Sequence, residues 1–144
     1  MVERHVARAT AIVGLMGIAL IHLLDLQSKF HETPYLGAAY LALIAGCFVV
    51  AVRLVHHDDR STWYAAAFLA ALTMVGYAVN RTVGMPNATE DVGNWLEPLG
   101  LASLFVEAMV VAIAVLRLRS PDEDTSQTTY YRSSAEAQPT RAWR

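Results

Sequence analysis

The chain has 144 residues, 55% of them hydrophobic, and a formal net charge of −2. Its apolar residues gather in four long segments with almost no charge, whereas a soluble domain of this length has shorter apolar segments broken by charged residues. The single cysteine, Cys47, excludes an internal disulfide and the thiol–disulfide enzymes that need a cysteine pair. The sequence has no block rich in Lys and Arg, and it therefore does not indicate nucleic acid as a partner.

Each of the four segments is close to the length of about 20 apolar residues that crosses a bilayer as a helix. A soluble four-helix bundle would show polar helix faces at helical period, but these segments are apolar nearly all round. We therefore predict an all-α transmembrane four-helix bundle in residues 1–119, with helices at about 9–26, 34–54, 61–80 and 97–117.

The start of the chain superficially resembles a signal peptide. Its apolar run is longer than a signal core, however, and no small-residue cleavage site follows, so we expect a retained first helix. Lys and Arg mark the cytoplasmic side of a membrane protein. Lys29 and Arg81 flank one side of the predicted spans, and six arginines flank the other: Arg4, Arg8, Arg53, Arg60, Arg117 and Arg119.

This charge pattern predicts a multi-pass protein of a bacterial plasma membrane with the N- and C-termini in the cytoplasm. Residues 120–144 are polar and have too few apolar residues to build a core, which predicts a disordered cytoplasmic tail.

The longest connection joins the third and fourth helices. Gly84, Pro86 and Asn87 indicate a turn, and Asn87 with Glu90 fits a capping pair that would start a short helix. Glu97 followed by Pro98 fits the N-cap and first position of the fourth helix, where a negative charge favours the positive end of the helix dipole.

Glu107 lies at the midpoint of the fourth segment, with nine uncharged residues on either side. A carboxyl group at that depth costs about 3 kcal/mol on insertion scales, so it usually faces other helices. Two interpretations are open. Glu107 is either a protonated carboxyl group that bonds to other helices, or a residue that takes part in moving protons, ions or a ligand.

Polar or small residues also form stripes at helical spacing on the first, third and fourth helices. Packing these helices together would bury all three stripes. We expect a polar pocket that opens to the external side and contains the candidate residues His22, Asp25, Tyr77, Asn80, Arg81, Glu97, Ser103 and Glu107.

Structural roles are the alternatives for several of these residues. His22 would then be a hydrogen-bonded imidazole, Asp25 would pair with Arg81 or Lys29, and Glu97 would only cap its helix. The Tyr77 stripe would be ordinary helix packing.

No zinc-protease, phosphate-binding, nucleophile-elbow or redox-cysteine motif is present, which favours a non-enzymatic protein. A metal enzyme that uses His22, Asp25 and Glu97 is the weakest alternative, because the sequence has no paired metal-ligand motif. A bis-histidine haem would need a second deep histidine besides His22. We therefore assign no metal-binding residues, and the sequence leaves the cofactor unknown.

Three parts of the sequence look similar to one group of proteins. They are residues 81–100 (RTVGMPNATEDVGNWLEPLG) with Ser103 and Glu107, residues 22–25, and residues 34–37. Together they resemble uncharacterised four-helix integral membrane proteins of high-GC Gram-positive bacteria. The resemblance covers about residues 9–118. It implies the four-span architecture, draws attention to the third connection and the fourth helix, and implies no activity.

The sequence thus predicts a small integral membrane protein whose intramembrane pocket binds or conducts a small ligand, ion or proton. The alternative is an accessory subunit of a larger membrane complex, motivated by the small size of the chain and by Gly14, Gly17 and Gly46, which allow close helix packing. The expected partners are the lipid bilayer and either further copies of the chain or a larger complex.

Overall fold

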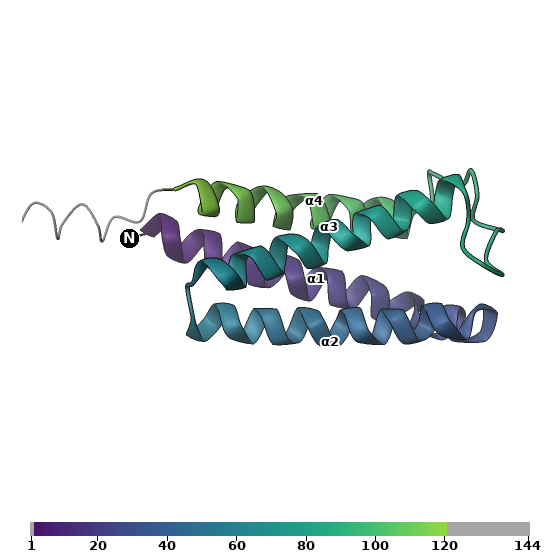
Figure 1. Ribbon diagram of the computed structural model, residues 1–144, viewed down its shortest axis with the longest axis horizontal. Helices are drawn as coiled ribbons and strands as arrows, with labels where there is room; N and C mark the ends of the chain where they lie inside the picture. The colour runs from purple at the N-terminus through teal and green to yellow at the C-terminus, as the bar shows by residue number, and fades with distance from the viewer. Residues whose placement is uncertain (1, 121–144) are drawn as a thin grey trace, which may run out of the picture.

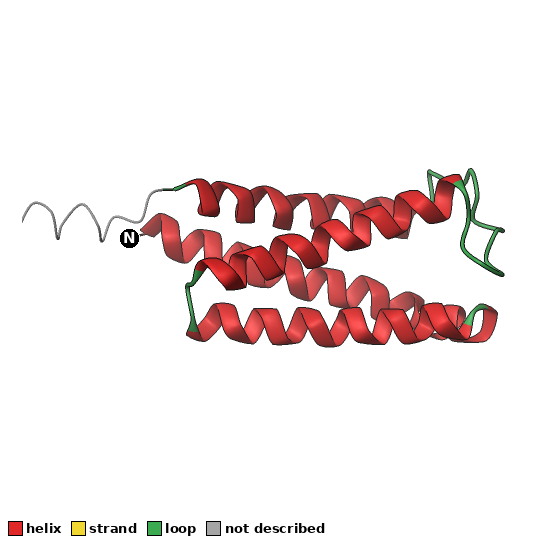
Figure 2. Cartoon of the chain, viewed as in Figure 1, coloured by secondary structure: helices red, strands yellow, loops and turns green. Residues whose placement is uncertain are grey.

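The computed structural model describes residues 2–120, which form four helices and no β-strand (Figure 1; Figure 2). The predicted all-α class and the number of helices are confirmed. The predicted tail lies, except for Ser120, outside the described residues. In chain order the helices are α1 (Val2–Glu32), α2 (Pro34–His56), α3 (Arg60–Thr82) and α4 (Pro98–Arg119).

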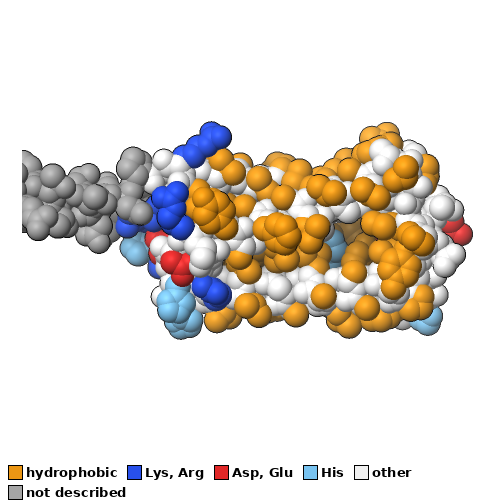
Figure 3. All heavy atoms as spheres, viewed as in Figure 1, with side chains coloured by type: hydrophobic (Ala, Val, Ile, Leu, Met, Phe, Trp, Pro, Cys, Tyr) orange, Lys and Arg blue, Asp and Glu red, His pale blue; other side chains and the backbone are white. Residues whose placement is uncertain are grey.

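All four helices are long and apolar enough to cross a membrane. Many large apolar side chains on their surfaces are more than half exposed, among them Val13, Phe68 and Phe105. Hydrophobic side chains cover the middle of the bundle, and Lys and Arg side chains gather at one end (Figure 3). A surface of this kind suits contact with lipid tails rather than with water.

Successive helices run antiparallel, so the bundle has two ends (Figure 1). The terminal end holds the start of α1, the end of α4 and residues 57–59. The loop end holds Thr33, which alone separates α1 from α2, and the connection of residues 83–97. Pro34 stops α1 from continuing, because proline has no N–H and restricts the residue before it. A Cβ on Gly37 would lie 2.6 Å from Phe30 Cγ, so glycine permits this sharp turn.

The connection of residues 83–97 contains the predicted turn. Met85 and Ala88 exchange backbone hydrogen bonds of 3.1 and 2.9 Å across Pro86 and Asn87. The prediction that a short helix starts at Asn87 is wrong. Asn87 has a φ of 58° and closes this turn instead of capping a helix. The predicted cap of α4 is confirmed, since Glu97 Oε2 accepts from Gly100 N at 3.1 Å and Pro98 follows.

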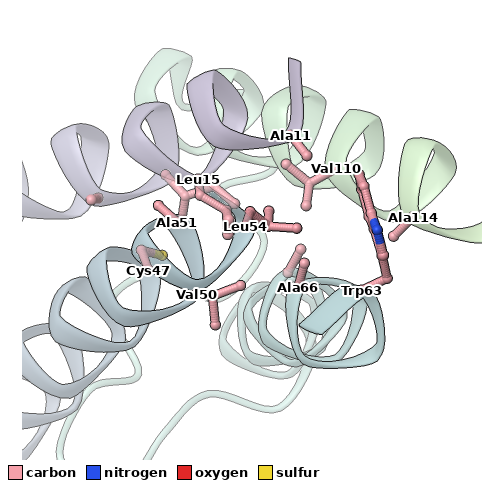
Figure 4. Packing of buried hydrophobic residues seen from close by; sticks show 13 residues of the cluster. Ala11, Leu15, Cys47, Val50, Ala51, Leu54, Trp63, Ala66, Val110 and Ala114 are labelled. Carbon is pink, nitrogen blue, oxygen red and sulfur yellow. The ribbon is translucent and has the colours of Figure 1, made fainter. Parts of the chain in front are cut away.

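The terminal half of the bundle is packed with apolar side chains (Figure 4). α1 and α4 approach closely there, because a Cβ on Gly14 would lie 2.5 Å from Val110 Cγ2. Trp63 fills the space near Ala114, and its indole N–H donates to Asp58 Oδ1 at 2.7 Å. The completely buried members of this core include Ala11, Leu15, Ile18, Cys47, Leu54, Ala66, Ala70, Val110 and Ala114.

The loop-end half is built differently. α2 and α3 lie close together near their short connection and separate toward the loop end (Figure 1). The polar stripes predicted from the sequence lie in this half of the bundle, where the helices leave space between them.

Candidate functional site

A cavity of about 410 Å³ lies in the loop-end half of the bundle. All four helices and the connection of residues 83–97 contribute to its wall. All eight residues predicted for the polar pocket line this one cavity: His22, Asp25, Tyr77, Asn80, Arg81, Glu97, Ser103 and Glu107. The structure therefore brings them together, while their role in binding stays a prediction.

Glu107 lies deep in the cavity wall and is only 1% exposed. Its Oε1 accepts a hydrogen bond of 2.6 Å from Ser103 Oγ, one turn earlier on α4. Its Oε2 is buried and has no hydrogen-bond partner among the described residues. A carboxyl group that joined helices together would bond to another helix, but the bond that Glu107 makes stays within its own.

His22 reaches the cavity from α1 and is buried. Its Nδ1 lies 2.9 Å from the carbonyl oxygen of Ile18. A carbonyl oxygen only accepts, so Nδ1 carries a proton, and in the neutral ring Nε2 is left as an acceptor. The ring also packs edge-on against Tyr40 of α2, with centroids 4.7 Å apart. This arrangement fixes the ring and leaves its second nitrogen available.

Asp25 lies one turn from His22 and is partly buried. Its Oδ2 accepts a long hydrogen bond of 3.4 Å from the Tyr40 hydroxyl. The ion pair expected between Asp25 and Arg81 or Lys29 is not formed, because both cations pair with other carboxylates. Asp25 is thus a carboxylate on the cavity wall that has no paired cation among the described residues.

Arg81 closes the loop end of the cavity. It is 5% exposed and pairs with Asp91 Oδ1 at 2.6 Å and with Glu97 Oε2 at 2.9 Å. Its guanidinium also lies over the Tyr77 ring, 5.1 Å from the centroid. Gly100 makes room for that ring, because a Cβ on Gly100 would collide with Tyr77 Cε2. These contacts tie the end of α3 to the start of α4.

Asp91 is the centre of this polar cluster, although it is not among the residues predicted for the pocket. Lys29 Nζ lies 3.3 Å from its Oδ2, and Asn80 Nδ2 donates to the same oxygen at 3.0 Å. Burial alone would raise the pKa of Asp91, but the hydrogen bonds from Arg81 and Asn80 and the charge of Lys29 outweigh burial and lower it. The only signal in the sequence was a carboxylate ten residues after Arg81.

The cavity has a mouth between α2 and α3. On this side the wall of the cavity is apolar and comes from Leu36, Ala39 and Leu43 of α2 and from Leu72 and Gly76 of α3. Ala39 and Leu72 are also exposed at the surface, so the cavity reaches the outside there. Figure 3 shows a hollow among hydrophobic side chains with a histidine visible inside it, and His22 is the histidine of the cavity wall.

The unpaired polar atoms of the cavity wall are mostly acceptors. They include Glu107 Oε2 and Asn80 Oδ1, and Asp25 has a single long hydrogen bond. In the part of the chain that the structure describes, no group of three His, Cys, Asp or Glu side chains could hold a metal ion. The arrangement can therefore hold a group that donates hydrogen bonds or carries positive charge.

No protein-family model, curated protein or solved structure matches this sequence. The resemblance to four-helix membrane proteins of high-GC Gram-positive bacteria accordingly stays an expectation.

Proposed function

We propose that this chain is a multi-pass membrane protein that binds a small ligand in the cavity of its loop-end half. The observation that carries the proposal is Glu107, a buried carboxyl group in the middle of a helix whose Oε2 has no partner among the described residues. Leaving such a group unsatisfied costs about 1–3 kcal/mol or more. A ligand that donates to Oε2 would remove this cost.

Binding is favoured over conduction by the packing of the two halves. The cavity ends where the apolar core of the terminal half begins, and Leu15, Leu54 and Val110 in that core are completely buried. An ion or proton crossing the bundle would have to pass this core of apolar side chains, which cannot replace its water. The arrangement suits a receptor or carrier site more than a continuous path.

We further propose that the termini lie in the cytoplasm and that the protein resides in the bacterial plasma membrane. The six arginines that flank the helices at the terminal end support this orientation, since among residues 2–120 only Lys29 and Arg81 lie at the loop end. The cavity then belongs to the external half of the bilayer.

The accessory-subunit alternative loses part of its motivation. Gly14 and Gly17 face Val110 and Val106 of α4, and Gly46 faces Leu69 of α3, so these glycines serve packing within the chain. Ala42 and Ala45 of α2 are exposed and are left as a small-residue surface for a partner.

Native mass spectrometry of the full chain, extracted from its own membrane in mild detergent, tests the proposal. We expect an adduct of discrete mass on the wild-type chain, with its occupancy reduced about tenfold or more in Glu107→Gln. The matched control is Glu90→Gln, which changes an exposed carboxylate of the loop and should keep the adduct.

A wild-type chain without any adduct would contradict the proposal, and so would an adduct that Glu107→Gln leaves unchanged. A discrete complex with a second protein, formed without a small-molecule adduct, would favour the accessory subunit instead.

A further inference from the structure

The mouth of the cavity opens at a depth that lies within the bilayer. At a rise of about 1.5 Å per residue, Ala39 lies about 8 Å from the loop end of α2 and Leu72 about 15 Å from the loop end of α3. Both helices have 23 residues and are about 35 Å long, against about 30 Å for the hydrocarbon layer. A mouth at this depth faces lipid tails.

The polar cluster lies between the cavity and the loop end of the bundle. Arg81 is almost completely buried there, joins α3 to Glu97 and Asp91, and lies against Tyr77. Lys29 joins α1 to Asp91 as well. A ligand from water would have to pass these ion pairs, whereas a ligand from the bilayer would pass between apolar residues of α2 and α3: Leu36, Ala39, Leu43, Leu72 and Gly76.

The charges of the wall define the polar end of the ligand. The two cations of the wall, Lys29 and Arg81, are already paired with carboxylates. Asp25 and Glu107 have no such partner among the described residues, and Asn80 Oδ1 is an unpaired acceptor. Arg81 Nε is an unpaired donor, but its guanidinium is neutralised by two carboxylates. Apart from Arg81 Nε, the unpaired polar atoms of the wall are therefore acceptors, and its cations already have carboxylate partners.

We propose that the ligand is a lipophilic amine that enters from the bilayer between α2 and α3, an inference that rests on the proposed function. Its ammonium group lies in the cavity as donor and counter-charge to Glu107 and Asp25, and its alkyl chain leaves through the mouth beside Gly76 into the lipid. A fatty acid or a phospholipid phosphate would bring a second negative charge to these carboxylates. A neutral alcohol would donate one hydrogen bond and supply no positive charge.

Gly76 provides a way to block the mouth without disturbing the fold. A Cβ at this position meets nothing within 4 Å, so Gly76→Leu introduces its Cβ without a clash, and we expect the rest of the side chain to occupy the opening. Leucine also has a higher helix propensity than glycine. The matched control is Ala78→Leu, two residues further along α3 at an exposed position, which adds an apolar side chain away from the cavity wall.

The test uses the full chain in phosphatidylcholine nanodiscs and reads bound probes by native mass spectrometry. The probes are dodecylamine, dodecanol, dodecanoic acid and ethylamine. We expect one dodecylamine per chain, bound about tenfold or more tighter than the other three probes. Binding should weaken about tenfold or more in Glu107→Gln, Asp25→Asn and Gly76→Leu, and stay at the wild-type level in Ala78→Leu.

Three results would overturn the inference. If dodecanol or dodecanoic acid bound as tightly as dodecylamine, the proposal that the cavity selects an ammonium group would be refuted. Ethylamine binding as tightly as dodecylamine, with no effect of Gly76→Leu, would refute entry from the lipid. Failure of dodecylamine to bind would refute the amine class, while the proposed function is decided separately by the adduct that the chain carries from its own membrane.

Discussion

Two charged side chains of the bundle are almost completely buried, and their surroundings differ. Arg81 lies between two carboxylates and an aromatic ring, so most of the cost of burying its charge is offset. Glu107 has only the hydroxyl of Ser103, on its own helix. The ion pairs give Arg81 a structural role, whereas Oε2 of Glu107 has no hydrogen-bond partner among the described residues.

Asp91 allows a pH test of the polar cluster. Its pKa is lower in the folded protein than the ordinary value of 3.8. A depressed pKa contributes stability above the unfolded value, and this contribution is lost as the pH falls below about 4. We expect the melting temperature of the wild-type chain in detergent to fall in that range. Asp91→Asn should cost about 1 kcal/mol at pH 7 and show a smaller fall.

The neighbouring exposed carboxylate provides the control for this experiment. Glu90→Gln should keep both the melting temperature at pH 7 and the acid-dependent fall of the wild type. If Asp91→Asn matched the wild type at pH 7 and fell equally in acid, Asp91 would not hold the cluster together.

At the scale of helices, close packing of α1 on α4 depends on a missing side chain. Gly14→Leu should destabilise the bundle by about 1–3 kcal/mol or more, because the new side chain would overlap Val110 and lie near Met109. The measurement is thermal unfolding in detergent. Ala45→Leu adds bulk at an exposed position of α2 and should have little effect, and an equal loss in both variants would contradict this account of the interface.

The helices themselves were largely predictable from hydropathy, but their ends were not. The first helix was predicted at about 9–26 and spans Val2–Glu32. Hydropathy detects the part of a helix that suits the lipid, whereas polar residues at both ends continue the same helix into the interface. At Asn87 a turn replaces the expected short helix because the backbone there has a positive φ. The capping pattern alone does not reveal this backbone conformation.

At the scale of the whole molecule, the eight candidate residues meet because of topology. Each lies in the half of its segment that an up-and-down bundle places at the same end, so stripes on separate helices were enough to predict that they share one cavity. The mouth between α2 and α3 and the central position of Asp91 were not predictable. Both depend on how far helices separate and how a loop folds back, which the helical period does not contain.

An experimental structure of the full chain, determined with lipids retained from its own membrane, tests the central claim most directly. We expect a bound molecule in the cavity, with a donor within hydrogen-bond distance of Glu107 Oε2 and an apolar part that leaves between α2 and α3. A cavity filled by the side chains of the protein, with Glu107 Oε2 bonded to another helix, would show that Glu107 serves packing and would contradict the account.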